Sequence, residues 1–74
     1  MILLERQPVK SRILRSVGYD DRTKILEIEF QNGLVYQFFD VPPKVSMELM
    51  RSGEVGKYFT DKVRTRFRTK QVIV

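Results

Sequence analysis

Cysteine and histidine are both absent from this chain of 74 residues. Without cysteine, no disulfide can stabilise the fold, and neither a thiolate metal site nor a thiol nucleophile can form. Without histidine the commonest general base is missing, so neither a serine–histidine nor a cysteine–histidine pair can be built. We therefore expect a protein that is not an enzyme and that holds no metal ion or cofactor.

Long apolar runs are lacking as well. The apolar start of the chain runs directly into Glu5, which makes it far too short for a signal-peptide core or a membrane span. Repeats, linkers and low-complexity tracts are not seen either. With 42% apolar residues, including five Phe and three Tyr, the chain is too hydrophobic to be disordered. We expect one domain over residues 1–74, in the cytoplasm and without membrane contact, near the lower size limit for an unaided core.

The acidic residues that stand in pairs do not indicate chemistry. Asp20 and Asp21 lie in a polar segment rich in turn formers, and a metal site would need more ligands. Glu27 and Glu29 are two residues apart on one face of an expected strand. We interpret that face as solvated, and not as an acid–base pair.

The strongest fold signal is Asn32-Gly33, which separates two alternating runs and is typical of a β-hairpin. A two-residue turn would pair Phe30 with Val35 and turn the aromatic side chains of the second run toward solvent. A three-residue loop at 31–33, with its glycine left-handed, instead pairs Phe30 with Leu34. Because each buried large side chain contributes about 1.5–3 kcal/mol, we predict the three-residue loop. The inward side chains are then Leu26, Ile28, Phe30, Leu34, Tyr36 and Phe38.

Period-two patterns predict an antiparallel meander of three strands, at 12–19, 24–31 and 34–39. In the first of them Ile13, Val17 and Tyr19 share one side. A short strand within residues 1–10 must stop at Gln7-Pro8 or lie at a sheet edge, because proline cannot donate to the ladder.

Two short helices follow the predicted sheet. Pro42-Pro43 opens the first helix, with Asp40 as its cap, and Ser52-Gly53 ends it. The second helix covers roughly residues 54–63. Gly56 weakens it by about 1 kcal/mol relative to alanine, so we expect another segment to pack closely there.

The fold class is therefore α+β, a three-stranded antiparallel meander with two short helices packed on one face. The apolar terminal segments, 2–4 and 72–74, are β-prone and would form extra strands. We predict that the two termini pair with each other or with a second copy of the chain.

The net charge of +5 is unevenly distributed. Residues 1–56 carry equal numbers of acids and bases, whereas residues 57–74 hold six bases and only Asp61 as an acid. If residues 64–70 are extended, their four cations point the same way, about 6.6 Å apart. Such segregation favours an anionic partner, although a solvated basic segment is the plainer explanation. The candidate phosphate-binding residues are Lys57, Lys62, Arg64, Arg66, Arg68 and Lys70, with Tyr58 and Phe67 as stacking faces.

Several motifs stand in a fixed order between residues 11 and 67. They are Ser11-Arg12-Ile13, Val17-Gly18-Tyr19-Asp20, Leu26-Glu27-Ile28-Glu29-Phe30, Asn32-Gly33, Val35-Tyr36-Gln37-Phe38, Val41-Pro42-Pro43 and Gly56-Lys57-Tyr58-Phe59. In this order they resemble the KTSC domain, a module of some lysyl-tRNA synthetases that also occurs as small bacterial and phage proteins. The family's central motif is Tyr-x-Tyr, whereas Tyr36-Gln37-Phe38 lacks one hydroxyl. Residues 1–10 and 68–74 lie outside the resemblance.

Two functions follow from these observations. The resemblance implies a small binding domain with a link to RNA. Together with the charge segregation, it predicts a non-catalytic module that binds RNA or single-stranded nucleic acid through residues 57–70. The alternative is a protein-interaction or homodimerisation module with no nucleic-acid role. The apolar termini, the strand edges and the expected outward position of Val35 and Phe39 favour this second function.

Overall fold

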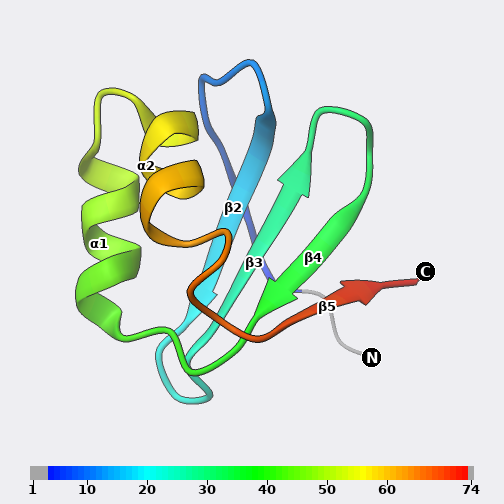
Figure 1. Ribbon diagram of the computed structural model, residues 1–74. Coiled ribbons are helices and arrows are strands. Elements are labelled where there is room, and N and C mark those ends of the chain that lie inside the picture. Colours follow the sequence, from blue (N-terminus) through cyan, green and yellow to red (C-terminus); the bar gives the residue numbers. More distant parts are fainter. Residues whose placement is uncertain (1–3, 74) are drawn as a thin grey trace.

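The computed structural model describes residues 4–73, which form one five-stranded antiparallel sheet and two helices (Figure 1). The α+β class is confirmed, and the three strands expected from the sequence form the centre of the sheet. Strand order in the sheet follows the chain, so every connection joins neighbours. The elements are β1 (Gln7–Pro8), β2 (Leu14–Asp20), β3 (Ile25–Phe30), β4 (Val35–Phe38), α1 (Pro43–Arg51), α2 (Val55–Lys62) and β5 (Thr69–Val72).

The hairpin register predicted from burial is confirmed. Leu26 lies opposite Phe38, and Ile28 lies opposite Tyr36. The Phe30 amide donates to the Leu34 carbonyl at 2.9 Å, which closes the three-residue loop, and Gly33 adopts a φ of +89°. A left-handed residue at this position is what such a loop requires, and glycine adopts it without a steric penalty.

The two faces of the hairpin differ in part from the prediction. Leu26, Ile28 and Phe38 are buried beneath the helices, but Leu34 is 41% exposed because it lies in the loop beyond the end of β4. Val35, expected to face outward, is only 8% exposed. Its strand partner is Val72 of β5, which is also buried. Residues paired directly across strands point to the same face, so these two valines cover one another.

The inward side of β2 also differs from the prediction. Leu14 and Val17 enter the core, whereas Ile13 is 42% exposed. The pairing of β2 with β3 shifts between Leu14 and Ser16, which is a β-bulge. A bulge adds one unpaired residue and reverses the alternation beyond it. Arg15 is accordingly exposed, and Leu14 and Val17 both reach the core although they lie three residues apart.

The helices lie where the sequence predicts them, but the predicted cap of the first helix is not formed. Helix α1 begins after Pro42, and no side chain caps it. Asp40, the expected cap, adopts a φ of 58° and lies 3.8 Å from the Arg68 guanidinium instead. In α2 the expected close neighbour of Gly56 is present, because a Cβ there would lie 2.7 Å from Ser11 Oγ.

The strands nearest the two termini, β1 and β5, lie at opposite edges of the sheet (Figure 1), so within the described residues the predicted pairing of the termini with each other is wrong. The alternative, pairing with a second copy of the chain, stays a prediction. β1 pairs with β2, and β5 pairs with β4, because each finds a free strand edge close to its own end of the meander. The rest of the predicted terminal strands, residues 1–3 and 74, lies outside the described residues. Neither α1 nor α2 is long or apolar enough to cross a membrane.

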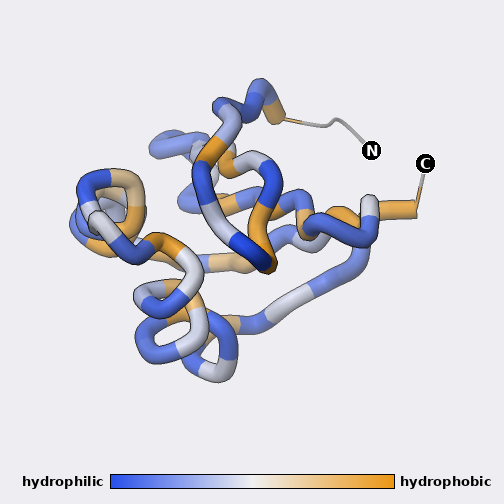
Figure 2. The backbone as a smooth tube through the Cα atoms, turned by 90° about the horizontal axis from the view of Figure 1, so that it is seen from above, coloured by the Kyte–Doolittle hydropathy of each residue, from blue (hydrophilic) through white to orange (hydrophobic). Residues whose placement is uncertain are grey.

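Seen from above, α1 and α2 lie together on one side of the sheet (Figure 2). The core between sheet and helices contains Leu49 of α1 and Phe59 of α2. Phe59 lies between two aromatic side chains of the sheet, with ring centroids 5.5 Å from both Phe30 and Phe38. Both pairs meet edge to face, an arrangement favoured by the ring quadrupoles.

Candidate nucleic-acid interface

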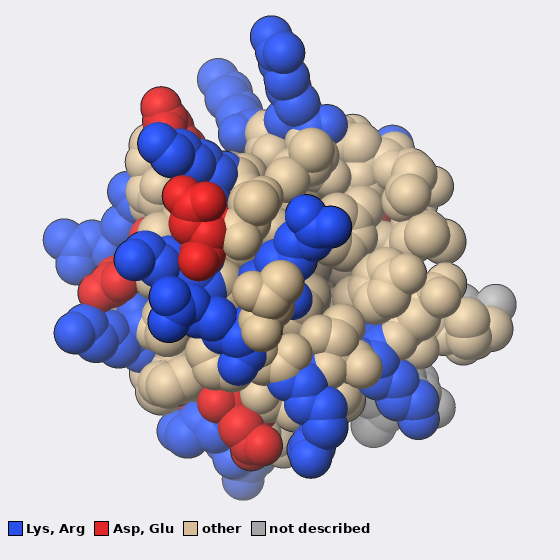
Figure 3. All heavy atoms as spheres, in the orientation of Figure 1, with Lys and Arg blue, Asp and Glu red and all other residues tan. Residues whose placement is uncertain are grey.

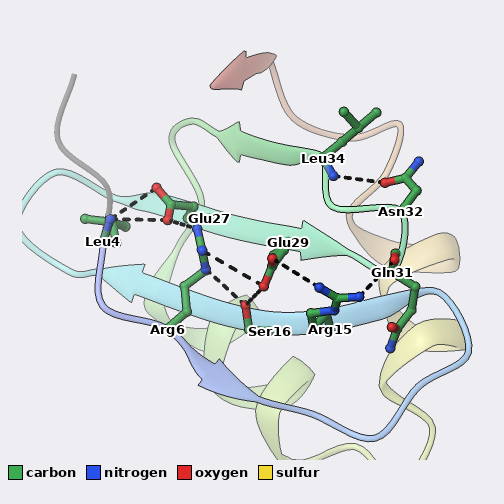
Figure 4. A network of polar contacts seen from close by, with 9 residues as sticks. All are labelled: Leu4, Arg6, Arg15, Ser16, Glu27, Glu29, Gln31, Asn32 and Leu34. Atoms are coloured by element: carbon green, nitrogen blue, oxygen red, sulfur yellow. Dashed lines mark hydrogen bonds and ion pairs between the residues drawn. The ribbon is translucent and has the colours of Figure 1, made fainter. Parts of the chain in front are cut away.

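A buried polar network occupies the sheet face opposite the helices (Figure 4). Glu27, expected to be solvated, is fully buried there. One of its carboxylate oxygens lies 2.5 Å from Arg6 Nη1, and the other accepts a 2.8 Å hydrogen bond from the Gln37 amide. The Leu4 backbone amide donates to both oxygens at 3.2 Å. The predicted solvated face is therefore wrong for Glu27, because the N-terminal segment covers it.

The segment that covers Glu27 crosses β2 at Gly18. A Cβ at Gly18 would lie 2.4 Å from the carbonyl oxygen of Glu5, so only glycine permits this approach. Arg6 Nε donates to Ser16 Oγ at 3.0 Å, and that hydroxyl donates to Glu29 at 2.8 Å. Both carboxylates are thus engaged by structural partners. We assign this face of the sheet to stability.

The basic C-terminal segment begins on the helix side, but it is not an extended comb. Lys70 pairs with Gln37 across β4 and β5 and therefore points to the opposite face of the sheet. Residues 63–66 form turns in which the Arg64 amide donates to the Phe59 carbonyl and the Arg66 amide to the Val63 carbonyl. Only Thr69–Val72 is a strand. The expected regular spacing of four cations is therefore wrong, because helix α2 ends in a turn that the alternating sequence pattern does not reveal.

All six predicted phosphate-binding side chains are nevertheless exposed. Figure 3 shows Lys and Arg side chains projecting around an uncharged area on this face of the molecule. Arg68 is the one most engaged: its guanidinium lies 5.4 Å from the Phe39 ring centroid and near Asp40. The other five form no ion pair with a carboxylate of residues 4–73; they are Lys57, Lys62, Arg64, Arg66 and Lys70.

The two predicted stacking residues are not freely presented. Phe67 is half-buried and packs against the core. Tyr58 is half-buried as well, and its hydroxyl donates to Glu48 of α1 at 2.9 Å. Burial, and then the hydrogen bond and negative charge of Glu48, raise the pKa of Tyr58 above its ordinary value. Both rings thus help to fix α2 and the segment that follows it.

An open hollow with aromatic walls lies beside Arg64, and sequence analysis did not identify it as a site. We call it the aromatic hollow; it measures about 480 Å³ and is lined by Ile13, Phe30, Tyr36, Phe38, Phe59, Thr60, Arg64 and Thr69. A second hollow of about 630 Å³ adjoins it and shares Ile13 and Thr60. There Lys10, Arg12 and Lys57 stand beside two acids, Glu54 and Asp61. Lys10 and Arg12 are additional exposed cations of this face.

Comparison with known proteins gives related sequences and related structures. The model of the KTSC domain matches residues 10–67. An uncharacterised protein of Stutzerimonas stutzeri is 39% identical over 56 residues, covering 76% of this chain and 79% of that protein. A lysine–tRNA ligase of Nostoc punctiforme is 32% identical over 60 residues, covering 81% of this chain but 11% of the ligase.

Among solved structures, a KTSC domain protein from Yersinia pestis superposes with a TM-score of 0.91 at 30% identity. The match covers 96% of this chain and 100% of that one. Fold and surface thus define a small α+β domain whose helix side combines exposed cations with an aromatic hollow. The chain belongs to the KTSC domain family, which confirms the resemblance found in its motifs.

Proposed function

We propose that this protein is a non-catalytic cytoplasmic module that binds RNA, or another single-stranded nucleic acid, through the phosphates. The contacts come from the six exposed bases between Lys57 and Lys70. The observation that carries the proposal is the segregation of charge, since the whole net charge of +5 lies in residues 57–74. Neutralising phosphates releases condensed counterions, and this release supplies affinity without sequence preference.

Two further observations support RNA as the ligand. Five of the six bases have no carboxylate partner among the described residues, so their charge is available to a ligand. The chain also resembles a segment of lysine–tRNA ligases, which by name act on an RNA. A guanidinium can hold a phosphate with two parallel hydrogen bonds and can also stack on a base, so Arg64 and Arg66 suit this role.

Binding of a fluorescently labelled single-stranded RNA, followed by anisotropy at low salt, tests the proposal. The double variant Arg64→Gln/Arg66→Gln removes two exposed cations of the segment. The matched control Lys44→Gln/Arg51→Gln removes the same charge from exposed positions on α1. We expect the first pair to weaken binding at least tenfold more than the second. Equal losses would mean a general charge effect, and absence of binding at low salt would remove the proposal.

A protein-interaction or homodimerisation role is the second candidate, and one observation favours it. Leu34 is 41% exposed and Ile73 is 77% exposed, and both lie just beyond the Val35–Val72 pair, at the same end of β4 and β5. Static light scattering of the wild type and of Ile73→Asp tests it. A wild-type dimer that becomes a monomer in the variant would support this function, and two monomers would exclude self-association through this edge.

A further inference from the structure

The aromatic hollow exists because the helices cover only part of the sheet. Figure 1 shows α1 and α2 over the β2 side, while the chain after α2 passes below and joins the far edge as β5. The ends of β3 and β4 nearest their hairpin loop therefore lack a helical cover. Phe30 and Tyr36 are only half-buried there, and their rings meet edge to face with centroids 5.6 Å apart.

The polar groups of the aromatic hollow are few and available. The Tyr36 hydroxyl has no hydrogen-bond partner among residues 4–73. Thr60 and Thr69 use their hydroxyl hydrogens on backbone carbonyls, at 3.0 and 3.1 Å, and keep lone pairs free to accept. Arg64 stands at the hollow as an exposed cation. No carboxylate lines the aromatic hollow, in contrast to the adjoining one.

These features together select the chemistry of the occupant. Aromatic walls suit a flat, unsaturated ring, and the phenol and threonine hydroxyls suit hydrogen-bonding groups on its edge. Arg64 suits a negative charge directly beside that ring. An aliphatic side chain of a protein partner would use the walls but neither the free phenol nor the cation. A nucleobase attached to its phosphate uses all three.

We propose that the aromatic hollow binds one unstacked base of a single-stranded RNA, with Arg64 on the adjacent phosphate. The inference rests on the proposed function and adds to it a base-binding site made of Phe30, Tyr36 and Arg64. Bases inside a duplex are stacked and paired and cannot enter a hollow of this kind, whereas single strands can turn bases outward. The site therefore prefers single-stranded RNA to a duplex of the same sequence.

Anisotropy titrations of single-stranded and duplex RNA with Tyr36→Leu test the inference. Stacking of a base on an aromatic ring is worth about 1–3 kcal/mol, so we expect single-strand affinity to fall by a factor between about 5 and about 150. The matched control is Tyr19→Leu, the same change at a half-buried ring outside the aromatic hollow, with an expected change below about twofold. Circular dichroism melting of each variant verifies that it is folded under the assay conditions.

Photo-crosslinking of wild-type protein to a uridine-rich strand, followed by mass spectrometry, gives an answer even if Tyr36→Leu does not fold. We expect cross-links within residues 30–36. RNA binding with no effect of Tyr36→Leu, or with cross-links only elsewhere, would overturn the base-binding site but leave the phosphate-binding module intact. Absence of any RNA binding would overturn both and leave the aromatic hollow to a protein partner.

Discussion

Removal of the Arg6 guanidinium, by Arg6→Met, is expected to destabilise this domain strongly. The guanidinium neutralises Glu27, whose side chain is 0% exposed, while Arg6 itself is 19% exposed. Breaking a buried ion pair from one side costs about 3–5 kcal/mol, because an uncompensated charge stays behind. Gln37 and the Leu4 amide still donate to Glu27, so we expect the lower end, about 3 kcal/mol. A domain of this length has roughly 4–11 kcal/mol in total.

Urea unfolding followed by circular dichroism measures this loss. Arg15→Met is the matched control: Arg15 is 54% exposed and lies 3.9 Å from Glu29, so its loss should stay below about 1 kcal/mol. The double variant Arg6→Met/Glu27→Met removes both charges and should recover much of the stability lost in Arg6→Met. The reasoning fails if Arg6→Met costs no more than Arg15→Met, or if the double variant is less stable than Arg6→Met.

Three other predictions concern packing and pH. Gly18→Ala should cost about 1–3 kcal/mol in the same assay, because its Cβ would meet the Glu5 carbonyl oxygen at 2.4 Å; unchanged stability would contradict the crossing. Phe59→Ala should cost about 3–5 kcal/mol, because this side chain is 3% exposed between two rings; a loss under about 1 kcal/mol would contradict its place in the core. Burial and Glu48 raise the pKa of Tyr58 above 10.0, so the Tyr58 hydroxyl loses its proton at lower pH in the unfolded state than in the folded state. The free energy of unfolding should therefore fall as the pH rises past 10.0. Tyr58→Phe should lessen this fall, and an identical pH profile in the variant would contradict the prediction.

The parts of the fold that were predictable from sequence are those that local chemistry and burial decide together. Asn32-Gly33 indicates the hairpin, and the number of apolar side chains on each face selects its register, which the pairing of Ile28 with Tyr36 confirms. The alternating pattern of β2 wrongly predicted an inward position for Ile13, because a bulge between Leu14 and Ser16 breaks the period-two alternation. No residue type in that stretch marks such a bulge.

The burial of Glu27 and the course of the basic segment depend on tertiary contacts. Glu27 alternates with apolar residues and so resembles a solvated position; only the N-terminal segment crossing at Gly18 buries it. Residues 64–70 alternate like a strand, yet hydrogen bonds to the carbonyls of Phe59 and Val63 hold the first part in turns. Gly18 was the one available signal, since glycine within a strand indicates close approach of another backbone.

Of the candidate site, only the positive charge could be predicted from the sequence. The six cations are read directly from the sequence of residues 57–70, and the structure shows that all of them are exposed. The aromatic hollow combines side chains from the approach to β2, from β3 and β4, from α2 and from the following turn. Its formation depends on where the helices end above the sheet, and no local sequence pattern records that.

The salt dependence of RNA binding tests the central claim most directly. If four of the six bases each neutralise one phosphate of a single strand at a time, the logarithm of the binding constant should fall with the logarithm of salt concentration with a slope of about −3. In Arg64→Gln/Arg66→Gln two contacts are lost, and the slope should flatten to about −1.4. A slope near zero for the wild type, or the same slope in both proteins, would contradict phosphate binding by this segment.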